Sequence, residues 1–384
     1  MSARAFALIT VLALASFNAN AQVPTMSSDA CGTPVAVGDG WPIEKPESVG
    51  LDGARLCGIA PRLKATEANV HSVVIARRGK LVFEQYFAGY DEPWGMDDKD
   101  YEFDATTKHD MRSVSKSVTS LLVGIAASRG LFAVDDRVMN FFPDYAPIKG
   151  LGWEQVSLRH LLTMSSGMRW DEVLAWTDPK NDEPHLGTEP DPLRYVLSKP
   201  IDSFPGTTWT YSGGSTDLLG AIIEKTSGKT FEAFAREALF EPLGITDWEW
   251  KKYQNGRFAP AAGLRLRPRD AAKIGQLVLN RGLWDDKQVV PAQWIADSTA
   301  PRFQAIGLFG GLYLYGYQWW LGRTFADGKE VQWISGQGWG GQRLFIIPSL
   351  DIVVVTTAAM YASPRQNNPG LEILAQFVIP AVTD

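Results

Sequence analysis

The sequence predicts an α+β fold, an α/β sandwich in which one antiparallel sheet is formed from both chain ends and flanked by helices. Strand-like runs occur at 71–87 and again from residue 315 onward, whereas the segment between about 113 and 246 shows only helical and loop patterns. The late runs follow one another through short turns, which favours antiparallel pairing over crossover units. Strands near both ends with helices between them imply one sheet and an inserted all-helical subdomain at about 113–246.

The N-terminus has the pattern of a secretory signal peptide. Arg4 precedes an apolar run over 5–17, and "ANA" then ends at Ala21. A basic residue, a short apolar run and small residues are typical of a cleaved signal, so we predict a signal peptide over 1–21 and export to the periplasm or the medium. The run is too short to span a bilayer with ease.

The next segment, 22–50, is rich in Pro and Gly and lacks periodicity, which predicts an extended arm on the surface; the folded domain then covers 51–384. Cys31 and Cys57 are the only cysteines. An oxidising setting would let them pair and tie the arm to the first helix. Equally, Cys57 could be a small buried residue and Cys31 a free thiol on a loop.

Composition excludes several classes of protein. Hydrophobic residues make up 45% and charged residues 21% of the 384-residue chain, as in a soluble globular protein with a sizeable core. A formal net charge of −6 without Lys/Arg blocks argues against a nucleic-acid partner. No later stretch is apolar enough for a membrane helix. Nothing indicates the oligomeric state.

Local patterns place the elements. Asp52 is predicted to cap a helix that ends near Asn69, and "HSVVIARRGKLVFEQYF" predicts a hairpin around Arg78-Gly79. An acidic, aromatic loop follows over 89–104. Helices are predicted at 113–129, 157–163, 191–198, 213–227 and 230–239. Strands are predicted in "YGYQWWLG", "KEVQWISG", "QRLFIIP" and "LDIVVVTTA", and a last amphipathic helix over 370–382 can cover the sheet.

The segment "MRSVSKSVTSLLVGIAASRG" holds the first candidate catalytic residues. Ser113 and Lys116 stand three residues apart, so on a helix their side chains share a face and can touch. The apolar helix that follows would desolvate Lys116 and keep it close to neutrality, so that it could take the proton of Ser113. The same spacing also fits a serine N-cap followed by a solvated lysine, and the pattern alone is weak.

Two further segments contain candidate residues for the same active site. In "WTYSGGSTDLLGAIIE", Tyr211 lies on a Gly-rich loop before a helix and could relay a proton to a leaving group; alone it would more often be a packed aromatic. In "WISGQGWGGQRLFIIP", glycines interrupt a strand. Glycine lets a backbone approach a ligand closely, so a backbone N–H here could join that of Ser113 in an oxyanion hole. A hairpin with a bulge would look the same.

Together, these three segments resemble the serine β-lactamase and penicillin-binding superfamily, especially class C β-lactamases and their esterase and amidase relatives. "MRSVSKS", "YSGGSTDLLGAIIE" and "GWGGQRLFIIP" are most similar to 6-aminohexanoate-dimer hydrolases, and "SLRHLLTMSSGM" also resembles a recurrent family segment. The likeness covers roughly residue 70 to the C-terminus. It implies a β-lactamase-like fold, an α/β sandwich beside a helical domain, and a hydrolase without cofactor.

The resemblance also assigns roles to residues. It makes Ser113 the acylated nucleophile, Lys116 its base partner and Tyr211 the proton relay. The backbone N–H groups of Ser113 and Trp339 are the oxyanion candidates. The substrate-binding candidates are Trp170, Gly338 and Gly340; Trp170, with the acidic residues that follow it, could line the pocket and attract a substrate amine, although an isolated surface turn would carry the same residues.

Two departures from the family pattern bear on the substrate. Penicillin-recognising relatives carry Tyr-x-Asn, whereas Tyr211 is followed by Ser212 and Gly213. They also carry a Lys or His with Thr and Gly on the last strand, which helps hold a β-lactam carboxylate, where this chain reads "ISGQGWGG". Both losses favour a small linear amide, with a carboxylesterase or weak β-lactamase as the alternative. A non-turnover sensor of cell-wall fragments is the alternative from another class.

The histidines are predicted not to bind a metal ion. His71, His109, His160 and His185 show no HExxH or other close ligand spacing, and two cysteines cannot build a thiolate zinc site. His160 in "LRHLL" is predicted to be a hydrogen-bonded structural residue, because a Ser-His-Asp enzyme would carry its nucleophile on a G-x-S-x-G elbow and no such motif occurs.

Overall fold

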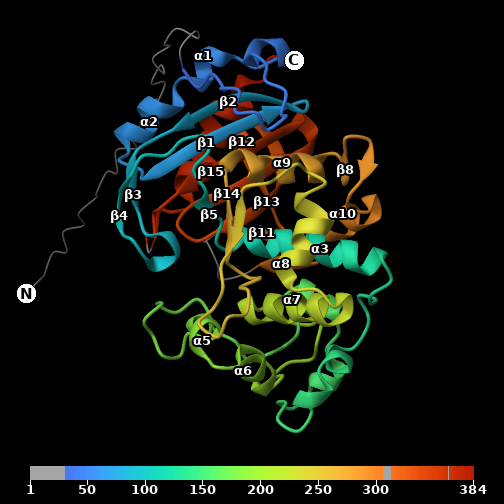
Figure 1. Ribbon diagram of the computed structural model, residues 1–384. Coiled ribbons are helices and arrows are strands. Elements are labelled where there is room, and N and C mark those ends of the chain that lie inside the picture. Colours follow the sequence, from blue (N-terminus) through green and yellow to red (C-terminus); the bar gives the residue numbers. More distant parts are fainter. Residues whose placement is uncertain (1–30, 306–312, 362) are drawn as a thin grey trace, which may run out of the picture.

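One antiparallel sheet of eight strands is built from both ends of the chain (Figure 1). The computed structural model describes residues 31–305, 313–361 and 363–384. From one edge to the other the strands are β10 (Phe303–Ala305), β11 (Tyr313–Tyr315), β12 (Trp320–Ala326), β13 (Lys329–Gly338), β14 (Gln342–Ile347), β15 (Ile352–Ala358), β1 (Val70–Arg77) and β2 (Lys80–Tyr86). All neighbouring pairs are antiparallel, so the predicted fold class is confirmed.

Both faces of the sheet are covered by helices. Along β1, Val74 belongs to one hydrophobic cluster and Val73 to a second, because successive side chains point to opposite faces. The helix α9 (Pro268–Leu279) packs on β1, β14 and β15 on the first face. The helices α1 (Gly53–Leu56), α2 (Ile59–Ala65) and α11 (Asn368–Glu372) lie on the opposite side with the C-terminal turns. The result is the sandwich that the sequence predicts.

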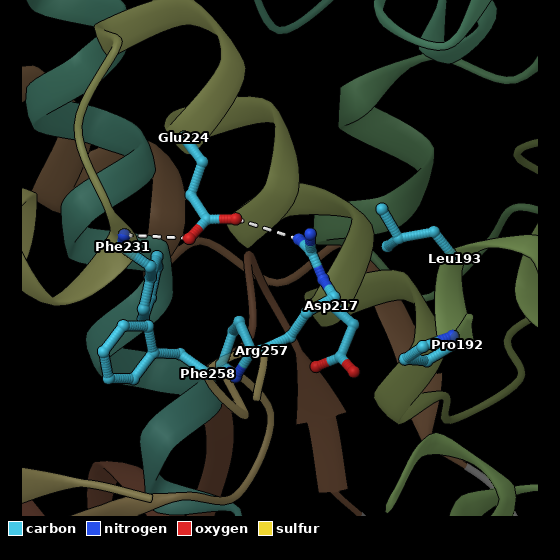
Figure 2. Close-up of a pocket in the computed structure, with 8 residues that line it drawn as sticks. Pro192, Leu193, Asp217, Glu224, Phe231, Arg257 and Phe258 are labelled. Atoms are coloured by element: carbon cyan, nitrogen blue, oxygen red, sulfur yellow. Dashed lines mark hydrogen bonds and ion pairs between the residues drawn. The ribbon is translucent and has the colours of Figure 1, made fainter. Parts of the chain in front are cut away.

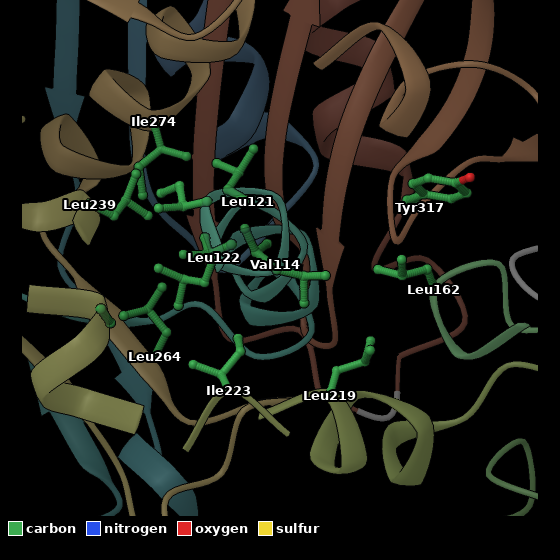
Figure 3. Packing of buried hydrophobic residues seen from close by; sticks show 14 of the residues in the cluster. Val114, Leu121, Leu122, Leu162, Leu219, Ile223, Leu239, Leu264, Ile274 and Tyr317 are labelled. Carbon is green, nitrogen blue, oxygen red and sulfur yellow. The ribbon is translucent and has the colours of Figure 1, made fainter. Parts of the chain in front are cut away.

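The helix that begins after Ser113 lies between the sheet and the helical part. This helix, α3 (Val114–Ser128), is buried along almost its whole length and contacts both β13 and α7 (Gly213–Ser227). Figure 3 shows apolar side chains around it from all sides, among them Leu162, Leu219 and Ile274. The other helices of this part are α4 (Leu158–Leu162), α5 (Glu183–Thr188), α6 (Pro192–Ser198) and α8 (Phe231–Ala235), and α10 (Ala292–Ser298) also contacts α3. The first turn of α3 therefore lies at the junction of the sheet and the helical part.

Several short strands were not predicted. The loop over 89–104 contains a hairpin, β3 (Gly89–Asp91) with β4 (Lys99–Tyr101), so its description as a loop alone was wrong. A small sheet in the order β5 (His109–Asp110), β7 (Leu264–Leu266) and β6 (Trp248–Trp250) leads directly into α3. A last pair joins β8 (Leu283–Trp284) to β9 (Lys287–Gln288). These strands have two or three residues, too few to show an alternating pattern.

The helix predicted over 52–69 is two shorter helices. Asp52 caps α1 as predicted, its side chain accepting the N–H of Arg55. The chain then bends at Cys57 and Gly58 before α2, which ends at Ala65. Pro61 in the first turn of α2 has no N–H to continue the hydrogen bonds of α1, which explains the break.

The other predicted elements differ from the observed ones mainly in their bounds. The helix predicted over 230–239 is α8 followed by a π-helical turn at Arg236–Phe240. The last helix begins at Asn368 rather than 370 and passes through a π-helical turn. "YGYQWWLG" is not one strand, because Gln318 at φ 62° turns the chain between β11 and β12. The helix α9 was missed, although Pro268 at its first position marks its start.

The N-terminal arm follows the edge strand β2. Hydrogen bonds join Leu81 of β2 to Pro42 and Glu44 of the arm, and the structure pairs Cys31 with Cys57 in a disulfide. The arm thus covers an edge that would otherwise present unpaired backbone groups. The predicted signal peptide, 1–21, lies outside the described residues. Within the described part of the chain, no helix is both long and apolar enough to cross a membrane.

Candidate active site

Ser113 stands at the N-terminus of α3, held by a strained turn. Arg112, just before it, adopts φ 48°, a left-handed conformation that is uncommon for a residue with a side chain. The hydroxyl of Ser115 donates to the Arg112 carbonyl at 2.6 Å and accepts the N–H of Leu264 in β7 at 3.1 Å. The turn is therefore fixed to the small sheet, and it leaves the Ser113 side chain half-buried.

Lys116 lies against this serine, as the spacing predicts. Its Nζ donates to Ser113 Oγ at 3.0 Å and to the Ala261 carbonyl at 3.3 Å. The residue is only 1% exposed. The contact rules out the alternative in which Lys116 is a solvated lysine one turn after an N-cap, and no side-chain capping bond of Ser113 is found.

Tyr211 completes the group. Lys116 Nζ lies 4.8 Å from the centre of its ring, and Tyr211 acts to raise the pKa of Lys116, while Ser113 acts to lower that of Tyr211. The ring is positioned by Trp320, whose centroid is 5.6 Å away, and by Trp209 at 6.0 Å. Next along the chain, Ser212 caps α7 by accepting the N–H of Ser215. The structure thus brings together the three candidate catalytic residues from separate segments.

The charge of Lys116 differs from the expectation. Burial alone would lower the pKa of its ammonium, but Tyr211, Glu172 and Glu183 outweigh burial and hold that pKa above its ordinary value. The direction of this shift is opposite to the expectation that burial brings Lys116 close to neutrality. Burial raises the pKa of the Tyr211 hydroxyl, while Lys116 acts to lower it.

Buried Trp170 and half-buried Glu172 form a support beside the site. Trp170 donates its indole N–H to Glu172 Oε2 at 2.6 Å, and the same oxygen accepts the N–H of Gly213, the first residue of α7, at 2.6 Å. Trp170 is 7% exposed and packs edge-on to Tyr195, so it positions Glu172 rather than forming an open pocket wall. Burial and then the charge of Glu183 raise the pKa of Glu172 to about 8.

Asp217 on α7 supports the carbonyl that Lys116 binds. Its Oδ1 accepts the N–H of Ala261 at 3.3 Å, and the Ala261 carbonyl accepts from Lys116. Asp217 lines a hollow of about 10 Å³, room for about one water, together with Glu224 and Arg257. Figure 2 shows these three side chains. None of the three candidate catalytic residues lines this hollow, and burial raises the pKa of Asp217 to about 7.

Sequence reasoning missed both supports of Lys116. An aspartate among the apolar residues of "STDLLGAII" is a signal that could have identified Asp217. A backbone carbonyl such as that of Ala261 leaves no signal in a sequence.

The Gly-rich end of β13 runs beside the first turn of α3. A Cβ at Gly338 would clash with the backbone carbonyl oxygen of Met111, and one at Gly336 would press on Val114. Trp339 follows Gly338 directly, so its backbone lies next to the turn that carries Ser113. This close approach of two backbones is the arrangement that the glycines predict.

The side chain of Trp339 helps form an aromatic wall. It stacks on Trp176 at a centroid distance of 6.0 Å and contacts Tyr361 at 5.0 Å. The Arg112 guanidinium lies over both Trp339 and Tyr361. Gly340 packs under Tyr361, and its N–H donates to Gln366 Oε1 at 2.7 Å, so this N–H is not available to a substrate.

Comparison with known proteins agrees with this geometry. The beta-lactamase family model matches residues 59–375. Lovastatin esterase from Penicillium rubens is 27% identical over 254 residues, 60% of this chain and 57% of that protein. Esterase EstB from Burkholderia gladioli is 27% identical over 195 residues, 48% of each. The chain thus spans about half the length of these curated relatives.

Solved structures share the fold. A protein of Bacillus anthracis provisionally named a 6-aminohexanoate-dimer hydrolase superimposes with a TM-score of 0.66 at 20% identity, over 83% of this chain and 80% of that one. The octameric penicillin-binding protein homologue of Pyrococcus abyssi gives 0.63 at 21% identity, over 85% and 76%. With a family model matched over most of its length and the Ser113, Lys116 and Tyr211 side chains in contact, the chain belongs to the beta-lactamase family.

Proposed function

We propose that this protein is a serine hydrolase that cleaves a small linear amide through an acyl-enzyme on Ser113. The observation that carries the proposal is the contact among a half-buried serine hydroxyl, a buried lysine 3.0 Å from it and a tyrosine whose ring centre lies 4.8 Å from the same lysine nitrogen. A serine hydroxyl becomes a nucleophile only when a neighbouring base takes its proton. The family match to relatives named as esterases supports a hydrolase.

The proton path runs through the Tyr211 and Lys116 pair. When the pair has lost one proton, the Lys116 ammonium stabilises a phenolate on Tyr211, and this oxygen accepts the proton as Ser113 Oγ attacks the substrate carbonyl carbon. Tyr211 then gives the proton to the leaving nitrogen or oxygen as its bond to carbon breaks. A water molecule repeats the sequence on the acyl ester and restores Ser113. Proton transfer by a positioned group contributes about 10²–10⁴-fold to a rate.

The negative charge that develops on the carbonyl oxygen needs donors. The backbone N–H of Ser113, at the start of α3, and that of Trp339, beside it, are the groups that we propose for this oxyanion hole. The aromatic wall of Trp176, Trp339 and Tyr361 would receive an apolar acyl chain.

An ester is the second candidate substrate. The two curated relatives described above are both named esterases, which favours carboxylesterase activity. The amide version rests on the resemblance of the three motifs to 6-aminohexanoate-dimer hydrolases. A panel of p-nitrophenyl esters, a linear 6-aminohexanoate dimer and a chromogenic cephalosporin separates ester, amide and β-lactam hydrolysis directly.

Labelling with a fluorophosphonate tests the nucleophile. We expect one adduct, located on Ser113 by peptide mapping, and none in Ser113→Ala. Ser128→Ala is the matched control, since Ser128 is an exposed serine on the same helix. A folded protein that stays unlabelled, or is labelled elsewhere, contradicts the proposal and favours a sensor that binds without turnover.

Export is part of the same proposal. The disulfide between Cys31 and Cys57 supports an oxidising compartment, where such bonds persist. Expression of the full chain in a host with a secretory system should release a protein whose N-terminus follows Ala21. Retention of residues 1–21 in the fractionated product would contradict export by a cleaved signal.

A further inference from the structure

A second cluster of chemistry-bearing side chains lies outside the Ser113 site. His71 at the start of β1, Asp91 in β3 and His109 in β5 place one ligand atom each within 4.8 Å of one another, and all three residues are buried. His71 Nδ1 is 2.9 Å from His109 Nε2, which is 3.5 Å from Asp91 Oδ2. Among the described residues, no other group of this kind is found.

The outer nitrogens of both rings face acceptors. His71 Nε2 is 3.1 Å from Asn69 Oδ1, and His109 Nδ1 is 3.0 Å from the backbone carbonyl of Asp110. The Asn69 amide cannot be reversed, because its Nδ2 donates to the carbonyls of Tyr90 at 2.8 Å and Ala359 at 3.2 Å. Each outer nitrogen must therefore carry its ring's proton, since a carbonyl or amide oxygen accepts but cannot donate.

This assignment leaves three acceptors facing one another. A neutral imidazole carries one proton, and in both rings that proton lies on the outer nitrogen. The inner lone pairs of His71 Nδ1 and His109 Nε2 then converge with the Asp91 carboxylate, with no proton between the two rings. Such an arrangement is unfavourable unless a cation joins it.

We propose that His71, Asp91 and His109 bind a divalent transition-metal ion of the Zn²⁺ type. Zinc bonds of about 2.0–2.2 Å in a tetrahedron put neighbouring ligand atoms about 3.4 Å apart, against 2.9 and 3.5 Å for two of the three pairs here, with all three atoms within 4.8 Å of one another. Metal-ligating histidines characteristically donate their other N–H to a carbonyl or carboxylate, as both rings do. The Tyr361 hydroxyl donates to Asp91 Oδ1 at 3.3 Å, which leaves Oδ2 for the ion.

The site would act as a structural clamp near the nucleophile. Its ligands come from three separate strands, and His109 stands four residues before Ser113 in the segment that leads into α3. An ion would therefore fix β1, β3 and β5 together and hold the strained turn at Arg112. The sequence prediction of no metal depended on ligand spacing, and these ligands are too widely separated along the chain to form a motif.

Zinc titration of the tag-free, chelator-treated full-length protein tests the site. We expect calorimetry with ZnCl₂ at neutral pH to show one ion per chain, together with a rise in melting temperature. Asp91→Asn, which keeps the shape of the side chain, should abolish both effects. Asn69→Leu, which removes the acceptor behind His71, should weaken binding about 10–100-fold. His185→Asn is the control, because His185 lies in α5 with Glu189 as its partner.

The alternative is a histidine pair without an ion, in which one ring adopts the other tautomer and donates to its neighbour. Folded wild-type protein that binds no zinc at a one-to-one ratio would show this and overturn the proposal. Equal zinc affinity in wild type and Asp91→Asn would also overturn it, since the ion would then be held elsewhere. Wild type alone decides the first point, even if a variant fails to fold.

Discussion

Lys116 is the residue on which the proposed chemistry depends most. It is buried, it contacts Ser113 and Tyr211, and Tyr211, Glu172 and Glu183 act to raise its pKa. An ammonium in this position lowers the cost of a phenolate on Tyr211 and orients the Ser113 hydroxyl. The Ala261 carbonyl cannot take over either role when the side chain is removed, because it is an uncharged acceptor.

Lys116→Ala should therefore lower kcat/KM by several orders of magnitude, since members of such a unit act together. Circular dichroism and a thermal melt would show that folding is retained. Lys229→Ala is a control from the exposed surface, where the lysine ammonium pairs with Glu237. Near-native turnover in Lys116→Ala would remove the lysine from the mechanism.

Glu172 gives the stability of the fold a pH dependence with a definite sign. Its pKa is about 8 in the folded chain against an ordinary value of 4.5. Between these values the unfolded chain has released the proton that the folded chain still holds, so stability falls as pH rises. The contribution is fully present below pH 4.5 and is lost by about pH 8.

We expect Glu172→Gln to flatten this fall, by an amount on the order of a few kcal/mol across the interval. Urea denaturation of both proteins at pH 5 and pH 8 measures the difference between their slopes. Glu154→Gln is the control, since this carboxylate is exposed and paired with Lys149. If the free energy of unfolding changes equally between pH 5 and pH 8 in wild type and Glu172→Gln, Glu172 is ionised in the folded protein near neutral pH.

At the scale of elements, the contact between the end of β13 and the first turn of α3 shapes the site. Gly338 lies against the backbone carbonyl of Met111, so any side chain there must move one segment away from the other. The two proposed oxyanion donors belong to these two segments. Their separation therefore depends on the absence of a Cβ at one position.

Gly338→Ala should lower kcat by about 10²–10³-fold, the cost of losing one oxyanion donor, with a smaller effect on KM. Steady-state kinetics with an ester substrate would separate the two constants. Gly187→Ala is the matched control, because a Cβ there meets only Tyr253 at 3.8 Å. Unchanged kcat in a folded Gly338→Ala protein would exclude this strand from transition-state binding.

The long elements were predictable because their patterns are strong. The ends of α7 agree with the predicted 213–227, where Ser212 and Gly228 mark the two caps. Short strands such as β5 have no periodicity to read, and π-helical turns depend on packing that is not local. The break between α1 and α2 follows from Pro61, whose position in the sequence already indicates an interrupted helix.

The site was predictable only where its residues occur in motifs. Ser113, Lys116 and Tyr211 were identified in this way and do meet. The charge of Lys116 was not predictable, because it is set by Glu172 and Glu183, which reach it only through the fold. Sequence patterning could suggest burial of the lysine but not which acids would surround it.

At the scale of the whole molecule, the sheet depends on the meeting of distant chain segments. β1 pairs with β15, and the arm before β1 runs along β2 and reaches α9, where Lys273 donates to the Asp39 carbonyl. The segments that carry Ser113, Lys116 and Tyr211 lie between these ends in sequence. Loosening the arm should therefore affect the stability of the sheet before it affects the chemistry of the site.

The disulfide between Cys31 and Cys57 provides the test of this separation. It closes a loop of 26 residues, and the loss of loop-closure entropy in the unfolded chain predicts a stabilisation of about 3.5 kcal/mol. Cys31→Ala should lower the free energy of unfolding in urea by that amount while fluorophosphonate labelling of Ser113 continues. Reduced wild type should match the variant, and a reductant should not change the variant further. Equal stability of oxidised and reduced wild type would show that noncovalent contacts alone hold the arm on β2.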